Sequence, residues 1–279
     1  MTEENIIIKA KDGYQLGTCV RKPKNEIKGV IQINSGTGIP QEFYKHFAIY
    51  LTQLGYITIT FDYRGIGSSK PKSLKGFKAT NLEWGTLDMS SILDWSIKKY
   101  PSLEKIVIGH SMGGQLIGLM ENNEKIDKVF IIASGTGYWK DMPKGLTKML
   151  MPFLWYFYMP LNTLLYGYSN AKKINQGENL PKGVALQWRK WCLNKDYWEN
   201  EFGKTINSNA FSKLTAPIKS IIFMDDNLIS QKANKKLLAY YSNSTINEIQ
   251  ITPQSVELNK IGHFGYFSRK SEKLWSNLI

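Results

Sequence analysis

The sequence predicts an α/β protein in which a mostly parallel, doubly wound sheet is interrupted by a helical insertion. Three observations support this fold class. Short apolar, β-branched runs alternate with longer amphipathic stretches, as in parallel strands joined by helices. A glycine-rich turn directly follows one of these runs, and the stretch 137–215 passes without a convincing buried strand.

The expected strands are six apolar runs: Gly29 to Ile33, Tyr56 to Phe61, Lys105 to Ile108, Val129 to Ala133, Ile218 to Met224 and Glu248 to Ile251. Between the first two, a helix is expected to begin at Pro40 and to stop at Gly55. A second helix is expected to have Asn81 as its N-cap and to be closed by Pro101. Two more follow the fifth run, at Gln231 to Tyr241 and near Glu272 to Leu278.

Residues 137–215 are expected to form a lid inserted into a core made of residues 1–136 and 216–279. The lid contains 15 of the 35 aromatic residues and five of the eight tryptophans, namely Trp139, Trp155, Trp188, Trp191 and Trp198. These rings could line an apolar ligand pocket between the lid and the sheet, or they could form the lid's own small core. The sequence leaves both interpretations open.

The charge is strongly basic, with 36 Lys and Arg against 23 Asp and Glu and a net charge of +13. A charge of this size makes nucleic acid or an anionic membrane a partner to consider. Only four of the basic residues are arginines, however, and bidentate recognition of guanine or phosphate depends on the planar guanidinium group. We therefore expect a small-molecule substrate and no nucleic-acid partner.

The cysteine pattern and the chain start predict a reduced, cytoplasmic protein. Cys19 and Cys192 have no metal-ligand spacing, and no motif calls for a cofactor, so neither a metal nor a cofactor is expected. The first residues lack the basic and apolar regions of a signal peptide. No stable membrane insertion is expected, because four residues interrupt the long apolar stretch 146–168. They are Lys148, Pro152, Pro160 and Asn162.

The most specific motif is the turn Gly-His-Ser-Met-Gly at residues 109–113, which follows an apolar run. It matches the G-x-S-x-G pattern that holds a nucleophilic serine on a sharp strand-to-helix turn. Small residues before and after the serine let the neighbouring backbones approach. We therefore predict that Ser111 is a nucleophile.

A serine nucleophile needs a base, and the chain has three histidines. His46 is expected on the solvent side of the first helix, and His110 precedes the serine and cannot readily turn back to it. His263 lies in a glycine-flanked loop after the last strand, where it can reach the carboxyl edge of the sheet. We expect His263 to be the base.

The third member of such a triad is a carboxylate that orients the histidine. Asp225 and Asp226 both follow the strand expected at Ile218 to Met224, and both lie between Ser111 and His263 in the sequence. We favour Asp226, with Asp225 as the alternative.

Two backbone N–H groups are needed to stabilise the oxyanion that forms during acyl transfer. One is expected from Met112, which follows the serine at the start of a helix. The other is expected from the glycine-containing loop after the first of the listed strands, with Thr37 as the first choice and Gly36 as the second.

Taken together, these motifs resemble the α/β-hydrolase superfamily. The resemblance rests on residues 109–114, on Phe61 to Ser69 and on the Gly-His-Phe-Gly segment at 262–265. Residues 37–44, Thr-Gly-Ile-Pro-Gln-Glu-Phe-Tyr, are similar to a group of predicted bacterial hydrolases of serine aminopeptidase or esterase type. In that superfamily the segment Asp62 to Ser69 is mainly structural. One departure is Ser35, which stands where the superfamily has histidine before the oxyanion loop.

The expected function is hydrolysis of an ester or thioester of a small or medium apolar acyl or aryl group, through a triad and an acyl-enzyme. A peptidase or a carbon–carbon bond hydrolase could use the same triad. A peptidase would need lid carboxylates to hold the substrate ammonium, and five acids are available there: Asp141, Glu178, Asp196, Glu199 and Glu201. A non-catalytic ligand-binding protein on the same fold is a further alternative.

Overall fold

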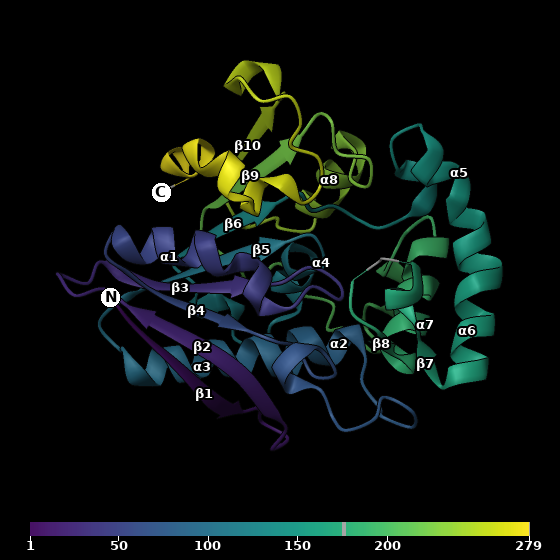
Figure 1. Cartoon of the computed structure of the whole chain (residues 1–279), viewed down its shortest axis with the longest axis horizontal. Coiled ribbons are helices and arrows are strands. Elements are labelled where there is room, and N and C mark those ends of the chain that lie inside the picture. The colour runs from purple at the N-terminus through teal and green to yellow at the C-terminus, as the bar shows by residue number, and fades with distance from the viewer. Residues whose placement is uncertain (175–176, 279) are drawn as a thin grey trace.

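The computed structural model describes residues 1–174 and 177–278, and a central sheet of eight strands runs through it (Figure 1). The strand order is β1-β2-β4-β3-β5-β6-β9-β10. The strands are β1 (Thr2–Lys9), β2 (Gln15–Lys22), β3 (Gly29–Asn34), β4 (Tyr56–Phe61), β5 (Glu104–His110), β6 (Lys128–Ile132), β9 (Ile218–Phe223) and β10 (Ile246–Ile251).

The six strands predicted from apolar runs are parallel to one another. The sequence analysis missed the hairpin of β1 and β2, which extends the sheet antiparallel to β4. β1 is an edge strand and is mostly exposed, so its residues do not form an apolar run. The predicted mostly parallel, doubly wound sheet is nevertheless confirmed.

Helices cover both faces of the sheet and form a separate apolar core on each. One core packs Phe47 and Leu51 of α1 against Ile31 and Ile33 of β3. The other packs α3 and α8 against the opposite face. The helices are α1 (Lys45–Gln53), α2 (Asn81–Glu83), α3 (Ser90–Lys99), α4 (Met112–Gln115), α5 (Leu146–Phe153), α6 (Met159–Tyr166), α7 (Lys182–Leu193) and α8 (Gln231–Leu238).

The predicted N-cap Asn81 is wrong by one residue. The Thr80 hydroxyl accepts the hydrogen bond from the N–H of Glu83, so Thr80 caps the helix. The Asn81 side chain is fully buried and donates instead to the carbonyl of Val184 in α7, at 2.8 Å. The asparagine therefore ties the sheet domain to the lid, a role that its local sequence does not reveal.

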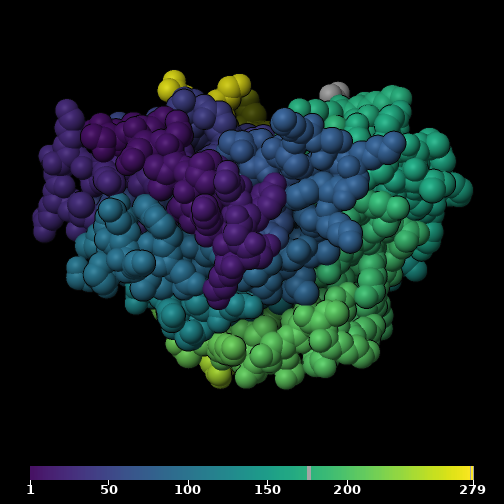
Figure 2. Space-filling view, turned by 90° about the horizontal axis from the view of Figure 1, so that it is seen from below, coloured from purple at the N-terminus to yellow at the C-terminus, as the bar shows by residue number. Residues whose placement is uncertain are grey.

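Between β6 and β9 the chain leaves the central sheet, and α5, α6 and α7 lie there with a two-residue strand pair, β7 (Tyr168–Ser169) and β8 (Leu180–Pro181). In Figure 2 the teal part of this segment lies at the end of the molecule away from the purple N-terminal residues. Trp191 and Trp198 are fully buried and pack edge to face, and they belong to the apolar core that also covers one face of the sheet. Trp188 lines a pocket instead. These two buried rings therefore join the lid to the main core, whereas Trp188 is placed to contact a ligand.

Residues 146–166 form one continuous helix, although the stretch contains Pro152 and Pro160. A π-helical turn, Leu154–Tyr158, joins α5 to α6. The N–H of Met159 bonds to the carbonyl of Leu154, but Pro160 has no N–H for the next carbonyl, that of Trp155. The Arg189 side chain donates to that carbonyl and replaces the missing bond. In the part of the chain that the structure describes, no helix is long and apolar enough to span a bilayer.

Candidate active site

Ser111 lies at the sharp turn between β5 and α4. Its backbone has φ 52° and ψ −119°, a conformation that is costly for a residue with a side chain. The glycines around it are required by space, because a Cβ on Gly113 would lie 2.3 Å from the carbonyl oxygen of Asn34 and a Cβ on Gly109 would lie 2.5 Å from the Cα of Gly114. These close approaches hold the serine outward at the carboxyl end of the sheet.

His263 and Asp226 complete a hydrogen-bonded chain with Ser111. The Oγ of Ser111 lies 2.9 Å from Nε2 of His263, and Nδ1 of His263 lies 2.7 Å from Oδ2 of Asp226. The other oxygen of Asp226 accepts the N–H groups of Leu228 and Ile229, at 2.7 and 3.0 Å. The carboxylate is therefore fixed on both sides, in the geometry that orients an imidazole toward a serine hydroxyl.

The side chain of the neighbouring Asp225 bonds to the backbone and not to the ring of His263. One of its oxygens accepts the N–H groups of Ile261 and Gly262, at 2.8 and 2.9 Å. Gly262 has φ +60°, which favours glycine, and the chain turns there directly before His263. Asp225 thus holds the backbone of the histidine loop, whereas Asp226 contacts the histidine ring.

His110 has a structural role that the sequence analysis did not foresee. It is fully buried, and burial lowers its pKa well below the usual range, so the ring is neutral. Its Nε2 lies 2.9 Å from the carbonyl oxygen of His263, which can only accept, so Nε2 carries the proton. Its Nδ1 must then accept the hydroxyl proton of Tyr44, at 2.7 Å. The remaining histidine, His46, is exposed as expected.

Tyr44 connects this histidine to the predicted oxyanion loop. The N–H of Gly36 donates to the Tyr44 oxygen at 2.9 Å, so one chain of hydrogen bonds runs from Gly36 through Tyr44 and His110 to the backbone of His263. Tyr44 is 66 residues from His110 in the sequence, and no local motif signals the contact.

Replacement of Tyr44 by phenylalanine should lower both stability and kcat. It leaves the N–H of Gly36 and Nδ1 of His110 buried without partners, so the free energy of unfolding should fall by about 1–3 kcal/mol. Since the His110 ring loses the partner that fixes its orientation, its bond to the backbone of His263 should weaken, and kcat should fall about tenfold while KM for a short ester changes little. Urea unfolding and steady-state kinetics measure the two effects.

Tyr241→Phe is the matched control. The Tyr241 oxygen accepts the N–H of Gly118 at 3.1 Å in another part of the core, so this variant should lose stability but keep kcat. An equal loss of kcat in both variants would contradict a positioning role for Tyr44.

The same hydrogen bond bears on the choice between the two predicted oxyanion donors. The N–H of Gly36 already has a partner in Tyr44. Thr37 is only half-buried and lines the pocket beside Ser111. Met112 is the first residue of α4, directly after the serine. This arrangement favours the N–H groups of Met112 and Thr37, rather than that of Gly36, as the oxyanion donors.

Ser111 and His263 open into a pocket of about 380 Å³ between the sheet and the lid. Most of its lining is apolar and includes Ile39, Phe43, Leu154, Met159, Leu180 and Trp188. Its size lies within the range of small-molecule sites, about 300–1,000 Å³. The pocket therefore suits an apolar group held next to the serine.

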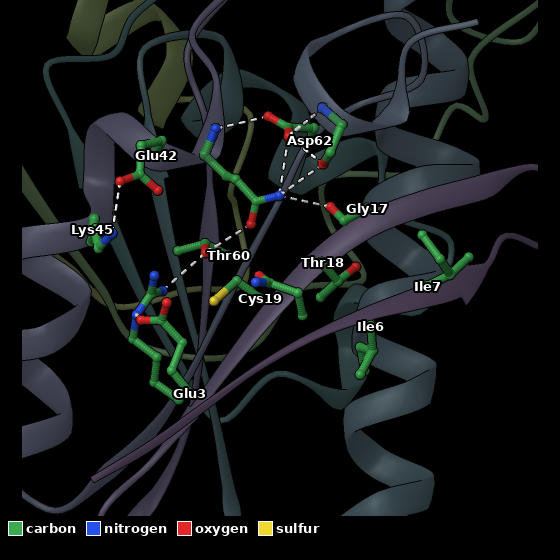
Figure 3. A pocket seen from close by; sticks show the side chains of 14 residues that line it. Glu3, Ile6, Ile7, Gly17, Thr18, Cys19, Glu42, Lys45, Thr60 and Asp62 are labelled. Carbon is green, nitrogen blue, oxygen red and sulfur yellow. Dashed lines mark hydrogen bonds and ion pairs between the residues drawn. The ribbon is translucent and has the colours of Figure 1, made fainter.

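A larger cavity, of about 500 Å³, lies by the N-terminal hairpin, away from these residues (Figure 3). Its charged groups are paired with one another, as Arg21 is with Glu3 and Lys45 with Glu42. Asp62 accepts two hydrogen bonds from Ser68 and holds that loop, in keeping with a structural role for this segment. We place the chemistry in the smaller pocket because it contains Ser111 and His263.

Within residues 1–174 and 177–278, no group of three or more His, Cys, Asp or Glu residues is arranged to hold a metal ion. Cys19 and Cys192 are both buried free thiols.

Comparison with solved structures identifies the fold. The chain is similar to a monoglyceride lipase from Saccharomyces cerevisiae, with a TM-score of 0.67 and 14% identity over 99% of this chain and 92% of that one. It is similar to an esterase from Pyrococcus furiosus, with a TM-score of 0.64 and 16% identity over 99% and 88% of the two chains. It is also similar to a carboxyl esterase from Bacillus coagulans, with a TM-score of 0.62 and 12% identity over 100% of this chain and 98% of that one. At these identities the likeness establishes the α/β-hydrolase fold.

A match to a protein-family model shows which family the sequence belongs to. The model described as serine aminopeptidase, S33, matches residues 25–183, which is more than half of the chain. This region includes the strand-to-helix turn at Ser111 and the loop that contains Thr37. The chain belongs to the serine aminopeptidase S33 family and is a serine hydrolase with the α/β-hydrolase fold.

Proposed function

We propose that the protein hydrolyses esters or thioesters of small or medium apolar acyl or aryl groups, with Ser111, His263 and Asp226 as its triad. The observation that carries the proposal is the hydrogen-bonded chain of these three side chains at the wall of an apolar pocket. Residues 137–215 contain 11 Lys and Arg against five Asp and Glu, and this basic lid suits a neutral or anionic substrate better than a cationic one.

The reaction would proceed in two halves. The Ser111 hydroxyl attacks the carbonyl carbon while Nε2 of His263 takes its proton, and Asp226 stabilises the resulting imidazolium. The N–H groups of Met112 and Thr37 stabilise the oxyanion. His263 then gives its proton to the leaving alcohol or thiol, and an acyl-enzyme forms. A water molecule then attacks the acyl carbon while His263 takes its proton. His263 returns this proton to the Ser111 oxygen as the acid leaves.

An ester is favoured over an amino-terminal peptide because of the charges around the pocket. Among the described lining residues there is no Asp or Glu that could hold a substrate ammonium. Asp141 is paired with Lys232 and Lys236, and Glu178 with Lys70 and Lys172. Glu201 accepts from Trp191 and Lys190. Three of the five lid acids that were candidates for peptide recognition are thus engaged elsewhere, and neither of the other two, Asp196 and Glu199, lines the pocket.

The direct test compares a series of p-nitrophenyl esters and acyl-thioesters with aminoacyl p-nitroanilides. We expect turnover of the esters, with little or none of the anilides. Preference for the anilides would instead support a peptidase. Absence of any fluorophosphonate adduct on Ser111, beside a labelled control hydrolase, would support a ligand-binding protein.

Trp188 should limit the length of the acyl group. Its ring lines the pocket and packs edge to face on Trp155, with the centroids 5.1 Å apart. Trp188→Ala should extend the pocket, so kcat/KM for longer acyl chains should rise relative to short ones, by up to about fourfold for each methylene that becomes buried. The measurement is the ratio of octanoate to butyrate hydrolysis. Trp139→Ala, which changes a lid tryptophan outside the pocket, should leave this ratio unchanged.

A further inference from the structure

The helix formed by α5, the π-helical turn and α6 leaves one long apolar face uncovered. Nine of its large side chains, here called the apolar stripe, are between 52% and 77% exposed. They are Leu146, Met149, Leu150, Phe153, Tyr156, Phe157, Leu161, Leu164 and Leu165. Figure 1 shows α5 and α6 along the outer edge of the molecule, on the side of the lid away from the sheet. Contiguous apolar surface of this extent marks an interaction site.

The opposite side of this helix is already used by the fold. Trp155, Met159 and Thr163 are buried against the rest of the lid. Leu154, Tyr158 and Met159 line the pocket next to Ser111. The apolar stripe is therefore a second apolar face of one helix, and packing within the described chain does not explain it.

The helix itself carries little charge, and the segments that flank it are basic; a cation at its middle, Arg189 of α7, lies 6.0 Å from the ring centroid of Tyr156. Residues 146–166 contain a single charged residue, Lys148. Before the helix lies the exposed Lys144, and after it lie the exposed Lys172 and Lys173. The loop 70–79, with exposed lysines at 72, 75 and 78, reaches the same end, since Gly167 packs against Lys75. Of the nearby acids, Asp141 is paired with Lys232 and Lys236. Glu178 is paired with Lys70 and with the flanking Lys172, so these two lysines together keep a net charge of +1.

We propose that the apolar stripe docks the protein on an anionic lipid bilayer, with the helix lying in the plane of the membrane surface. Apolar and aromatic side chains would enter the boundary between headgroups and acyl chains, while the flanking lysines would contact anionic headgroups. Tyr156 and Tyr166 suit the boundary between headgroups and acyl chains, because a tyrosine side chain has an apolar ring and a polar hydroxyl at its tip. The net positive charge of the lid thereby complements the anionic surface.

A second copy of the chain fits the apolar stripe less well. Both ends of the helix are basic, so pairing two such helices along their length would bring lysines against lysines in the parallel and in the antiparallel arrangement. Like charges brought together in this way are destabilising. An anionic surface avoids this repulsion along the whole length of the helix.

The test is co-sedimentation of the full-length protein with vesicles, which measures binding without turnover and so does not depend on the proposed reaction. Vesicles of phosphatidylcholine and phosphatidylglycerol should bind the protein, pure phosphatidylcholine vesicles should bind it more weakly, and 0.5 M NaCl should weaken the binding. The double variant Phe153→Glu, Phe157→Glu should bind at least about tenfold more weakly. Neither residue lines the pocket, so its turnover of a short water-soluble ester should match that of the parent.

Ile7→Glu is the matched control, since Ile7 is 56% exposed on β1, far from the lid. This variant should bind vesicles like the parent. Equal losses in the two variants, or no binding by the parent, would overturn the proposal. Sedimentation velocity supplies the second check: a dimer that the Phe153→Glu, Phe157→Glu variant dissociates would show that a second copy covers the stripe instead. Circular dichroism and thermal melting verify that each variant is folded.

Discussion

Ser111→Ala should reduce the turnover of short p-nitrophenyl esters by at least about 10⁴-fold. The substitution removes only the hydroxyl that would attack the substrate, and it keeps the Cβ in a turn where Gly109 and Gly113 already provide the space. This hydroxyl hydrogen-bonds to His263 in a partly exposed contact, so its removal should change the free energy of unfolding little. Thermal unfolding should therefore differ little from that of the parent.

Labelling with a fluorophosphonate separates loss of the nucleophile from loss of the fold. The parent should acquire one adduct at Ser111, and the alanine variant, equally folded, should acquire none. Heat-denatured parent serves as the background control. Turnover retained by Ser111→Ala would remove the serine from the mechanism, whatever the stability of the variant.

Asp226→Asn should be nearly as damaging, with a fall in kcat of about 10⁴-fold. The Asp226 carboxylate accepts a hydrogen bond from the Nδ1–H of His263, which leaves Nε2 free to accept one from Ser111. An amide at this position can present its NH₂ group to Nδ1, which stabilises the wrong tautomer. The imidazolium that forms during the reaction would also lose its negative partner.

The adjacent residue provides an unusually close control. Asp225→Asn keeps an oxygen for the N–H groups of Ile261 and Gly262, so kcat should fall tenfold at most. The two variants make the same change, from a carboxylate to an amide, at adjacent positions. The reverse order of effects would assign the orienting role to Asp225 and contradict the geometry described above.

The sequence predicted those parts of the site that depend on chain order and on local sterics. The turn around Ser111 needs glycines because backbones meet there, and this requirement is visible in the sequence. His263 and the acid pair could be found because they follow strands whose ends meet at one edge of a parallel sheet. Whether Asp225 or Asp226 contacts the ring depends on side-chain direction at a strand end, which no local pattern reports.

Contacts between distant segments were beyond prediction. The bond from Asn81 to the lid carbonyl of Val184 and the bond from Tyr44 to His110 each join residues far apart in the sequence. The continuous helix at 146–166 is a similar case, because the donor that replaces the N–H missing at Pro160 comes from Arg189 in α7. Local rules correctly identify proline as a poor helix residue, but they cannot show which neighbour compensates for it.

The hydrogen bonds of Tyr44 and His110 also limit how the two loops of the site can move apart. Any movement that separates the loop of Gly36 from the loop of His263 must break a hydrogen bond at a buried group, and each such group loses a partner that water does not replace. The two loops should therefore open together or not at all, as one cooperative unit of local unfolding. The base is thus anchored to the central sheet, because His110, which holds the His263 backbone, is the last residue of β5.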